Sequence, residues 1–501
     1  MSSNKKYWKS VEELKENSSV VETLQQKEFA EEIPVEDFLG DKKNLGDSKT
    51  SRRDFLKYVG FSTAAASLAA CEGPVTKSIP YVVQPERIVP GVANFYASTI
   101  ADGFDFASVL VKTREGRPIK IENNDLSKFK GGVNARVHAS VLSLYDTKRV
   151  KRPMIEGRNV SWEEFDREVR SALENANGEI VLLTQTFASP STSKLIQEFS
   201  SKYGNVRHVV YDTVSEDAAL NAFQSKYGRR ALPNYDFTKV KTVVGVGADF
   251  LADWQGGGYD AAFAKTRIPG NGEMSRHIQF ESNMSLTGAN ADKRVPVTPS
   301  QQKAVLSALR GYIAGGSSTS DLPAKIDDAV VKAARQLRQA GSGAVVACGI
   351  PDDEAQAWAL EINEALGSQV MDTANARVIR QGNSAEVAQL VEDMNNGSVG
   401  ALLIAGLNPV HTLPNAKDFV EGLKQVETVV DFTTRTDETS KLSKYVAATP
   451  HYLESWGDIQ FSERSFSLMQ PTIRPLFDTR QFQDTLLKWS DNNKSYYEYI
   501  Q

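Results

Sequence analysis

The chain has 501 residues, of which 41% are hydrophobic and 24% charged, a composition typical of a globular protein large enough for two or three domains. Its formal net charge is −5, whereas nucleic-acid binding needs a surface rich in basic residues, so we expect no nucleic-acid partner. No apolar run reaches the roughly 20 residues of a membrane-spanning helix, so we expect any membrane attachment to come from lipid or from partner subunits.

The first feature along the chain is an acidic, polar leader over residues 1–50. It has few aromatic residues and too little apolar surface to bury a core of its own. We expect this leader to be disordered or bound to a partner, and to be absent from the mature protein.

An export signal is predicted over residues 51–71. A twin-arginine pair is followed by a short apolar segment and then by Leu-Ala-Ala before a cysteine, as in lipoproteins exported by the twin-arginine (Tat) route. We therefore predict export by the Tat translocase, an acyl lipid on the cysteine, and a mature chain at the periplasmic face of the bacterial cytoplasmic membrane. The alternative is an Ala-rich core helix that happens to follow two arginines. The residues that carry the signal are Arg52, Arg53, Phe55, Leu56 and the lipidation site Cys71.

Residues 72–160 are predicted to form an irregular, proline-containing connector and a small β-containing domain. Alternating apolar runs at 108–112 and 118–121 flank a turn at 114–117. This arrangement predicts a β-hairpin.

Short apolar strands alternate with amphipathic helices from residue 161 to about 490. The pattern predicts an α/β fold with parallel sheets covered by helices on both faces. We expect two consecutive α/β domains, 161–320 and 321–490, and a tail over 491–501. The predicted strands are 179–184, 206–211, 242–247, 277–281, 344–348, 401–406 and 428–431, and the predicted helices are 161–175, 191–203, 214–227, 300–315, 325–339, 354–366 and 385–396.

The loops after these strands are the candidate ligand sites, because ligands gather at the carboxyl ends of parallel strands. None of the loops carries a complete dinucleotide-binding or Walker sequence. The candidate loops are 247–249, 281–283, 349–350, 406–409 and 431–433.

The chain contains two cysteines, Cys71 and Cys348. Cys348 lies in the predicted strand 344–348, which favours a buried structural thiol over a reactive one. Since iron–sulfur clusters are held by cysteine thiolates, a four-iron cluster is excluded if Cys71 is acylated.

The five histidines lack the spacing of a zinc site, so no metal ligand is predicted. His411 and His451 both fall near strand ends of the last predicted unit, and a shared pocket stays open as an alternative to ordinary turn positions. The histidines are His138, His208, His277, His411 and His451.

A series of segments resembles the molybdopterin oxidoreductases of the DMSO reductase superfamily, in order and in approximate spacing. The long leader before the Tat signal and the segment 77–80 narrow this resemblance to one half of the iron–sulfur subunit of bacterial alternative complex III, a quinol-oxidising respiratory assembly. The half in question is the N-terminal, molybdopterin-oxidoreductase-like one. The segments are 115–122, 144–154, 161–164, 406–410, 431–439 and 445–457.

The resemblance implies a structural subunit that supports electron transfer by its partners. These would be an iron–sulfur, ferredoxin-like half or subunit, a multiheme cytochrome c and integral membrane quinol-binding subunits. The sequence ends at Gln501 without cysteine-rich ferredoxin motifs, so that half is expected to be another polypeptide, or the sequence is a fragment.

The departures from the family pattern point away from catalysis. Cluster-bearing relatives place cysteines before and after the hairpin, whereas 98–106 and 131–136 contain none. We expect no iron–sulfur cluster, no molybdopterin and no catalytic residue in this chain.

A vestigial cofactor pocket is nevertheless implied by the resemblance. The molybdenum-ligand position falls near Ser215, which is more simply explained as the cap of a helix beginning at Glu216. Glu281 and Asn408 resemble positions that contact the dinucleotide of the pterin cofactor. The pocket candidates are Ser215, Gly247, Glu281, Gly406 and Asn408. Two rival functions stay open: an active molybdopterin-dependent oxidoreductase and a periplasmic ligand-binding lipoprotein.

Overall fold

The computed structural model describes residue 89 and residues 91–127, 132–269, 272, 274–316 and 321–501. The predicted leader, the export signal with Cys71, and the connector up to residue 88 lie outside the described residues. The described residues belong to one unit, Pro85–Gln501. No helix among them is both long enough and apolar enough to cross a bilayer.

The predicted hairpin is part of a small antiparallel sheet with the order β1-β2-β3. Helix α4 packs against β3, and its buried face joins Val109, Val111 and Ile121 in one apolar cluster. The elements are β1 (Ala93–Ala101), β2 (Phe106–Arg114), β3 (Arg117–Asn123) and α4 (Ala135–Leu144).

A seven-stranded sheet forms the larger α/β layer, with the order β5-β4-β16-β15-β14-β6-β7. The strands from β16 to β7 are parallel, and β4 pairs with β16 in the antiparallel sense. The strands are β4 (Met154–Ile155), β5 (Arg158–Asn159), β6 (Glu179–Thr184), β7 (Val206–Val210), β14 (Val399–Ala405), β15 (Thr428–Thr433) and β16 (Tyr445–Ala448).

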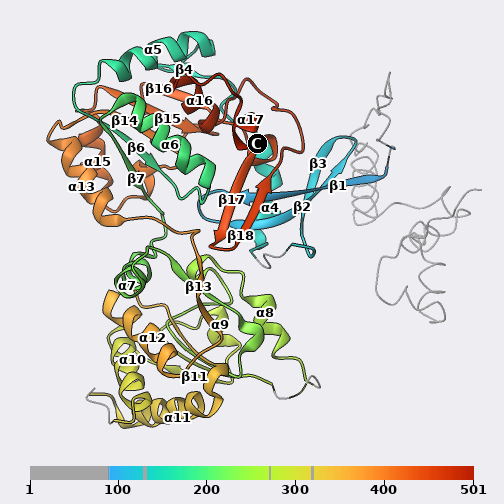
Figure 1. The fold of residues 1–501 in the computed structure, drawn as a ribbon, viewed down its shortest axis with the longest axis vertical. Helices are drawn as coiled ribbons and strands as arrows, with labels where there is room; N and C mark the ends of the chain where they lie inside the picture. Colours follow the sequence, from blue (N-terminus) through green and yellow to red (C-terminus); the bar gives the residue numbers. More distant parts are fainter. Residues whose placement is uncertain (1–88, 90, 128–131, 270–271, 273, 317–320) are drawn as a thin grey trace, which may run out of the picture. The chain divides into compact units, whose positions relative to one another are not determined.

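Helices cover both faces of this sheet (Figure 1). Alternate residues of the strands face opposite ways. Leu182 and Leu403 therefore pack against α5, α6 and α16, whereas Leu183 and Leu402 pack against α13 and α15. The helices are α5 (Trp162–Glu174), α6 (Pro190–Tyr203), α13 (Ser384–Asn395), α14 (Pro409–Thr412), α15 (Ala416–Leu423), α16 (Phe482–Trp489) and α17 (Tyr496–Ile500).

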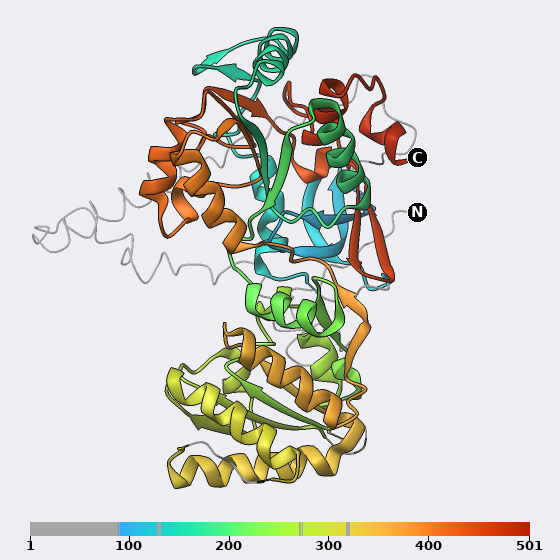
Figure 2. The same ribbon diagram turned by 60° about the vertical axis from the view of Figure 1, so that its left-hand side comes forward.

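A four-stranded parallel sheet with the order β11-β10-β9-β12 forms the second α/β layer. One face packs on α10, α11 and α12, and the other on an aromatic cluster around Phe237, Phe250 and Phe263. In Figure 2 the yellow helices α10 and α11 lie along one side of the green strands. The elements are α7 (Asp217–Tyr227), β9 (Thr242–Val246), α8 (Asp260–Lys265), β10 (Arg276–Glu281), α9 (Leu286–Ala289), β11 (Lys293–Pro296), α10 (Pro299–Ile313), α11 (Ala324–Ala340), β12 (Ala344–Cys348) and α12 (Asp353–Ala365).

A further sheet with the order β18-β17-β13-β8 is antiparallel and was not predicted. Its strands are short or irregular, and β13 shifts register between Asp372 and Arg377. The strands are β8 (Leu232–Tyr235), β13 (Met371–Arg377), β17 (Gly457–Ser462) and β18 (Ser465–Met469). The 3₁₀ turns among the described residues are η3 (Phe237–Lys239), η4 (Trp254–Gly256), η5 (Gly341–Gly343) and η6 (Tyr452–Glu454).

The assignment of strands to sheets differs from the predicted division of the chain into domains 161–320 and 321–490. Strands 179–184 and 399–405 are neighbours in one sheet, and the four-stranded sheet, over 242–348, is inserted between them in sequence. Strand β12, expected in the second domain, pairs with β9 of the first. The physical reason is that apolar periodicity identifies a buried strand but carries no information on which strand it pairs with.

Candidate functional site

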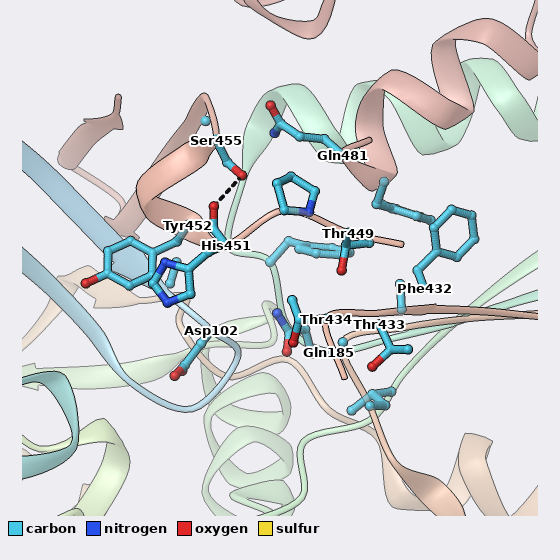
Figure 3. Close-up of a pocket in the computed structure, with 18 of the residues that line it drawn as sticks. Asp102, Gln185, Phe432, Thr433, Thr434, Thr449, His451, Tyr452, Ser455 and Gln481 are labelled. Carbon is cyan, nitrogen blue, oxygen red and sulfur yellow. Dashed lines mark hydrogen bonds between the residues drawn. The ribbon is translucent and has the colours of Figure 1, made fainter. Parts of the chain in front are cut away.

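A cavity of about 780 Å³ lies at the carboxyl ends of β6, β14 and β15 in the seven-stranded sheet (Figure 3). The loops after these strands contribute Gln185, Gly406 and Thr434. The end of β1 contributes Asp102, and η6 contributes Tyr452. A cavity is therefore present at the ends of parallel strands, where a ligand site was expected.

Aromatic side chains form one wall of the cavity. Phe187 and Phe482 stack at 5.4 Å between ring centroids, and Phe432 meets Phe482 edge-on at 5.0 Å. Phe432 and Phe482 are buried, so this wall is continuous with the core beneath α16.

His451 lines the cavity with both ring nitrogens already engaged. Nδ1 accepts the N–H of Leu453 at 3.2 Å, and Nε2 lies 2.9 Å from Oγ of Ser143. Burial, with a smaller contribution from the charge of Arg149, lowers the pKa of His451 to about 4, so the ring is neutral at pH 7. His411 lines the same cavity, so the structure favours the alternative of a shared pocket for these two histidines.

Asn408 also lines the cavity, but its amide holds the neighbouring loop. Its Oδ1 accepts from the N–H and the hydroxyl of Thr439, at 3.3 and 2.7 Å. Its Nδ2 donates to Oε2 of Glu438 at 2.7 Å, and this bond lowers the pKa of Glu438. The predicted cofactor contact is therefore used inside the chain.

Gly406 follows β14 and has a φ of +71°. The side of the backbone on which a Cβ atom would lie faces the side chain of Gln185. A Cβ atom at Gly406 would lie 2.6 Å from Cδ of Gln185. In the orientation of the Gln185 amide that satisfies both of its groups, the nitrogen donates to the carbonyl oxygens of Asp102 and Gly406, at 2.6 and 2.9 Å. Gln185 therefore closes the space that the glycine leaves open.

Asp458, from β17, meets the N-terminus of α6 at the edge of the cavity. Its carboxylate accepts from the Ser189 hydroxyl at 2.6 Å, from the Ser191 N–H at 3.2 Å, and from the Ser191 hydroxyl. The Tyr496 hydroxyl also bonds to this group at 3.4 Å. A carboxylate here is stabilised by the positive end of the helix dipole.

The remaining pocket candidates lie elsewhere, outside this cavity. Ser215 is exposed, and its hydroxyl accepts the N–H of Asp217 at 3.1 Å, but the N-cap residue of α7 is Glu216, so the helix starts one residue later than predicted and Ser215 precedes its cap. Glu281 is buried against Arg294, whose Nε donates to it at 2.5 Å, and against the Ser285 hydroxyl at 2.6 Å. Gly247 turns the chain after β9 with φ of +66°.

The single described cysteine is inert. Cys348 is buried in β12, and burial raises its pKa to about 12. This confirms the predicted structural thiol. Within the described ranges no group of three or more His, Cys, Asp or Glu side chains is arranged to hold a metal ion.

An ion pair joins Asp105, which follows β1, to Arg136 in α4. The Arg136 guanidinium donates from Nε and a terminal nitrogen to the carboxylate of Asp105, both at 2.9 Å. Asn134 adds a bond to Asp105 at 2.6 Å, and Arg136 reaches Asp253 at 2.7 Å. Charge-assisted hydrogen bonds between side chains thus connect Asp105 to Asn134 and Arg136.

A second cavity, of about 860 Å³, lies beside β8 and the loop after η4. It is lined by Gly256, Gly257, Gly258 and Tyr259, and it contains none of the predicted site residues.

Comparison with known proteins shows the fold. No protein-family model matches the chain. The chain is 25% identical over 492 residues to the menaquinone reductase, molybdopterin-binding-like subunit, of Nitratidesulfovibrio vulgaris (strain Hildenborough), covering 87% of this chain and 71% of that protein. Among solved structures, acetylene hydratase from Pelobacter acetylenicus superimposes with a TM-score of 0.66 at 11% identity, covering 79% of this chain and 69% of that one.

The predicted fold class is confirmed: the chain is an α/β protein with parallel sheets covered by helices, and it shares its fold with acetylene hydratase.

The pocket lining does not fit a pterin dinucleotide, whose phosphates are anionic. Four carboxyl groups and only two cationic side chains line the cavity. The charged lining residues are Asp102, Asp437, Glu438, Asp458, Arg435 and Lys441.

Sequence reasoning missed the two residues that decide this fit. Gln185 directly follows a predicted strand, so the strand-end rule applied there would have found it. Asp458 gives no local signal, since its contact with Ser191 joins residues 267 positions apart.

Proposed function

We propose that this chain is a cofactor-less, molybdopterin-oxidoreductase-like structural subunit of a respiratory quinol-oxidising complex of the alternative complex III type. The related menaquinone reductase subunit supports assignment to a quinone-linked complex. The observation that supports the absence of a cofactor is the charge of the pocket lining, in which carboxyl groups outnumber cationic side chains. In this role the chain positions partners that carry the electrons, namely an iron–sulfur subunit, a multiheme cytochrome c and integral membrane quinol-binding subunits.

The proposal includes a place for the chain at the periplasmic face of the cytoplasmic membrane. Its support is the sequence over 51–71, with the Tat motif and the lipidation site Cys71. Several acyl chains hold a protein at a membrane far better than one, which gives only marginal binding.

The test is purification from native membranes in mild detergent, followed by subunit identification and elemental analysis. We expect a multiheme cytochrome and membrane subunits to co-purify, and we expect molybdenum and tungsten at well below about one atom per copy of this chain, the load of a mononuclear site. A stoichiometric metal would instead establish the rival, an active molybdopterin-dependent oxidoreductase. Purification of the chain alone under these conditions would contradict the scaffold role.

Replacement of the lipidation site is expected to change the cellular fraction in which the protein is found. With Cys71→Ser, acylation is lost, and the chain should shift from the membrane to the soluble periplasmic fraction in cells that lack the partner subunits. Fractionation and immunoblotting measure the shift, and Cys348→Ala is the matched control because Cys348 is buried in β12. Unchanged membrane attachment of the Cys71 variant in these cells would contradict lipid anchoring.

The cavity of about 780 Å³ favours one second candidate, a periplasmic ligand-binding lipoprotein. A ligand that raises the melting temperature of the isolated chain would support this candidate. Loss of quinol oxidation on deletion of the chain from the complex, with no such ligand, would support the scaffold.

A further inference from the structure

The cavity lies at a topological switch point of the seven-stranded sheet. From β6 the chain moves to β7 on one side, and it later returns to β14 on the other side. In open α/β sheets, ligands bind in the crevice outside the carboxyl ends of the two strands where the order reverses. That crevice lies between Gln185, which follows β6, and Gly406, which follows β14.

Gln185 fills the crevice with its own side chain. Its backbone N–H donates to the Ala405 carbonyl oxygen at 3.2 Å, and its side-chain amide bridges the carbonyl oxygens of Asp102 and Gly406. The Cβ position at Gly406 is blocked by this amide, as is the Cβ position at Gly103, 2.6 Å from Cδ of Gln185. Because Gly103 and Gly406 have no Cβ atom, the Gln185 side chain fits at the place where a ligand would approach the backbone.

Asp458 takes the place of an anion at the helix that follows β6. The N-terminus of a helix after the first strand is where dinucleotide-binding folds hold phosphate, because its N–H groups and dipole favour negative charge. Here the carboxylate of Asp458 accepts the Ser191 N–H and the hydroxyls of Ser189 and Ser191. A phosphate entering this position would meet a negative charge and find these donors used.

The switch point of the four-stranded sheet is closed in a comparable way. Its order reverses between β9 and β12, which are followed by Gly247 and Gly349. The two backbones touch there, because a Cβ atom at Gly349 would collide with the Gly247 carbonyl oxygen. A Cβ atom at Gly247 would lie 2.9 Å from Oε1 of Gln302.

We infer that Asp458 and Gln185 are intramolecular substitutes for a phosphorylated ligand, and that they close this cavity to phosphate-bearing molecules. The inference deepens the proposed function, since it names the residues that keep the scaffold free of a dinucleotide. It assigns Asp458 the role of a specificity-determining residue: its charge rejects anions, and its hydrogen bonds stabilise α6 in place of a ligand.

The experiment is calorimetric titration of the full chain with inorganic pyrophosphate and with guanosine diphosphate. The wild-type chain is expected to show no binding up to about 1 mM ligand. Asp458→Ala combined with Gln185→Ala frees the helix terminus and the crevice, and its affinity for pyrophosphate should rise roughly tenfold or more and fall as salt is added. Asp458→Asn removes only the charge, keeps the shape of the side chain, and should show a smaller gain.

The matched control is Asp484→Asn, because Asp484 accepts the Tyr496 N–H at 2.7 Å in the same region, and no hydrogen bond from Asp484 to α6 is found among the described residues. Circular dichroism shows which variants fold, and Asp458→Asn carries the test if the double variant does not. Pyrophosphate binding by the wild-type chain at micromolar concentrations would overturn the inference, as would folded variants that bind no better than wild type. The metal and subunit analysis of the native complex is independent, so a wild-type chain that rejects pyrophosphate yet purifies without partners would contradict the proposed function alone.

Discussion

Arg149→Met should lower the free energy of unfolding by roughly 3–5 kcal/mol, the cost of leaving one member of a buried ion pair without its partner. The side chains of Arg149 and Glu454 are 1% and 0% exposed. The two guanidinium nitrogens meet the two carboxylate oxygens at 3.2 and 2.6 Å. Because the buried carboxylate cannot be rehydrated in the variant, we expect a strong loss of stability, measured as the midpoint of urea or thermal unfolding.

The same substitution should disturb the pocket, because Glu454 also fixes the turn at its edge. Its carboxylate accepts the N–H of His451 at 2.8 Å and of Leu476 at 2.9 Å. Burial alone would raise the pKa of Glu454, but the bonds from Arg149 and from these backbone groups hold it below its usual value. The pair therefore adds stability above the unfolded-state pKa, and this stability is lost as the pH falls through the folded-state pKa.

Two controls separate burial from charge. Arg435→Met removes a solvent-exposed partner of Asp146, 3.4 Å away, and should cost less than about 1 kcal/mol. The double variant Arg149→Met, Glu454→Leu removes both charges and should recover a large part of the loss. A single variant as stable as wild type would show that the pair contributes nothing.

The elements of the two α/β layers were predictable because each strand is a short apolar run buried on both faces. Strand 344–348, for example, is buried at every position and was predicted at the observed bounds. The antiparallel sheet of β8, β13, β17 and β18 was not predictable in this way. Strand β13 has the sequence MDTANAR, which shows neither alternation nor an apolar run, and it owes its conformation to partners far away in sequence.

The position of the candidate site could be predicted from the sequence, but the chemical character of its lining could not. The strand-end rule places Gly406 and Asn408 at the cavity, and both line it. The same rule also proposed Gly247 and Glu281, and family resemblance proposed Ser215, but none of the three lines the cavity. Their observed contacts are those of a tight turn, an ion pair and the start of a helix. What decides the character of the pocket is Asp458, whose partners are remote in sequence, so no local pattern reveals it.

Asp431→Asn should raise the stability of the protein at neutral pH. Asp431 lies in β15 with 0% exposure, between Ile404 and Val446 of the adjacent strands. Neither carboxyl oxygen has a hydrogen-bond partner among the described residues. Burial, together with the charge of Asp437, raises the pKa of Asp431 well above its ordinary value. The folded protein thus binds a proton at this carboxyl more tightly than the unfolded chain does.

The sign of the pH dependence follows from this difference in bound protons. A group with a raised folded-state pKa stabilises the fold fully below its unfolded-state pKa, and its contribution is lost as the pH rises through the folded-state pKa. Asn cannot ionise, so the variant should gain roughly 1–3 kcal/mol over wild type at pH 7, and the gain should vanish near pH 4.

Thermal unfolding at pH 4 and pH 7 measures the gain of Asp431→Asn, and a kcal/mol corresponds to roughly 2–4 °C for a domain of 150–250 residues. The control Asp328→Asn, on the exposed face of α11, should change stability by less than about 0.5 kcal/mol at either pH. Equal melting temperatures of the Asp431 variant and wild type at pH 7 would mean that this carboxyl is paired and charged in the folded protein. Since β15 ends at the pocket wall with Phe432, a gain would also show that the sheet beneath the cavity tolerates a buried acid at a cost in stability.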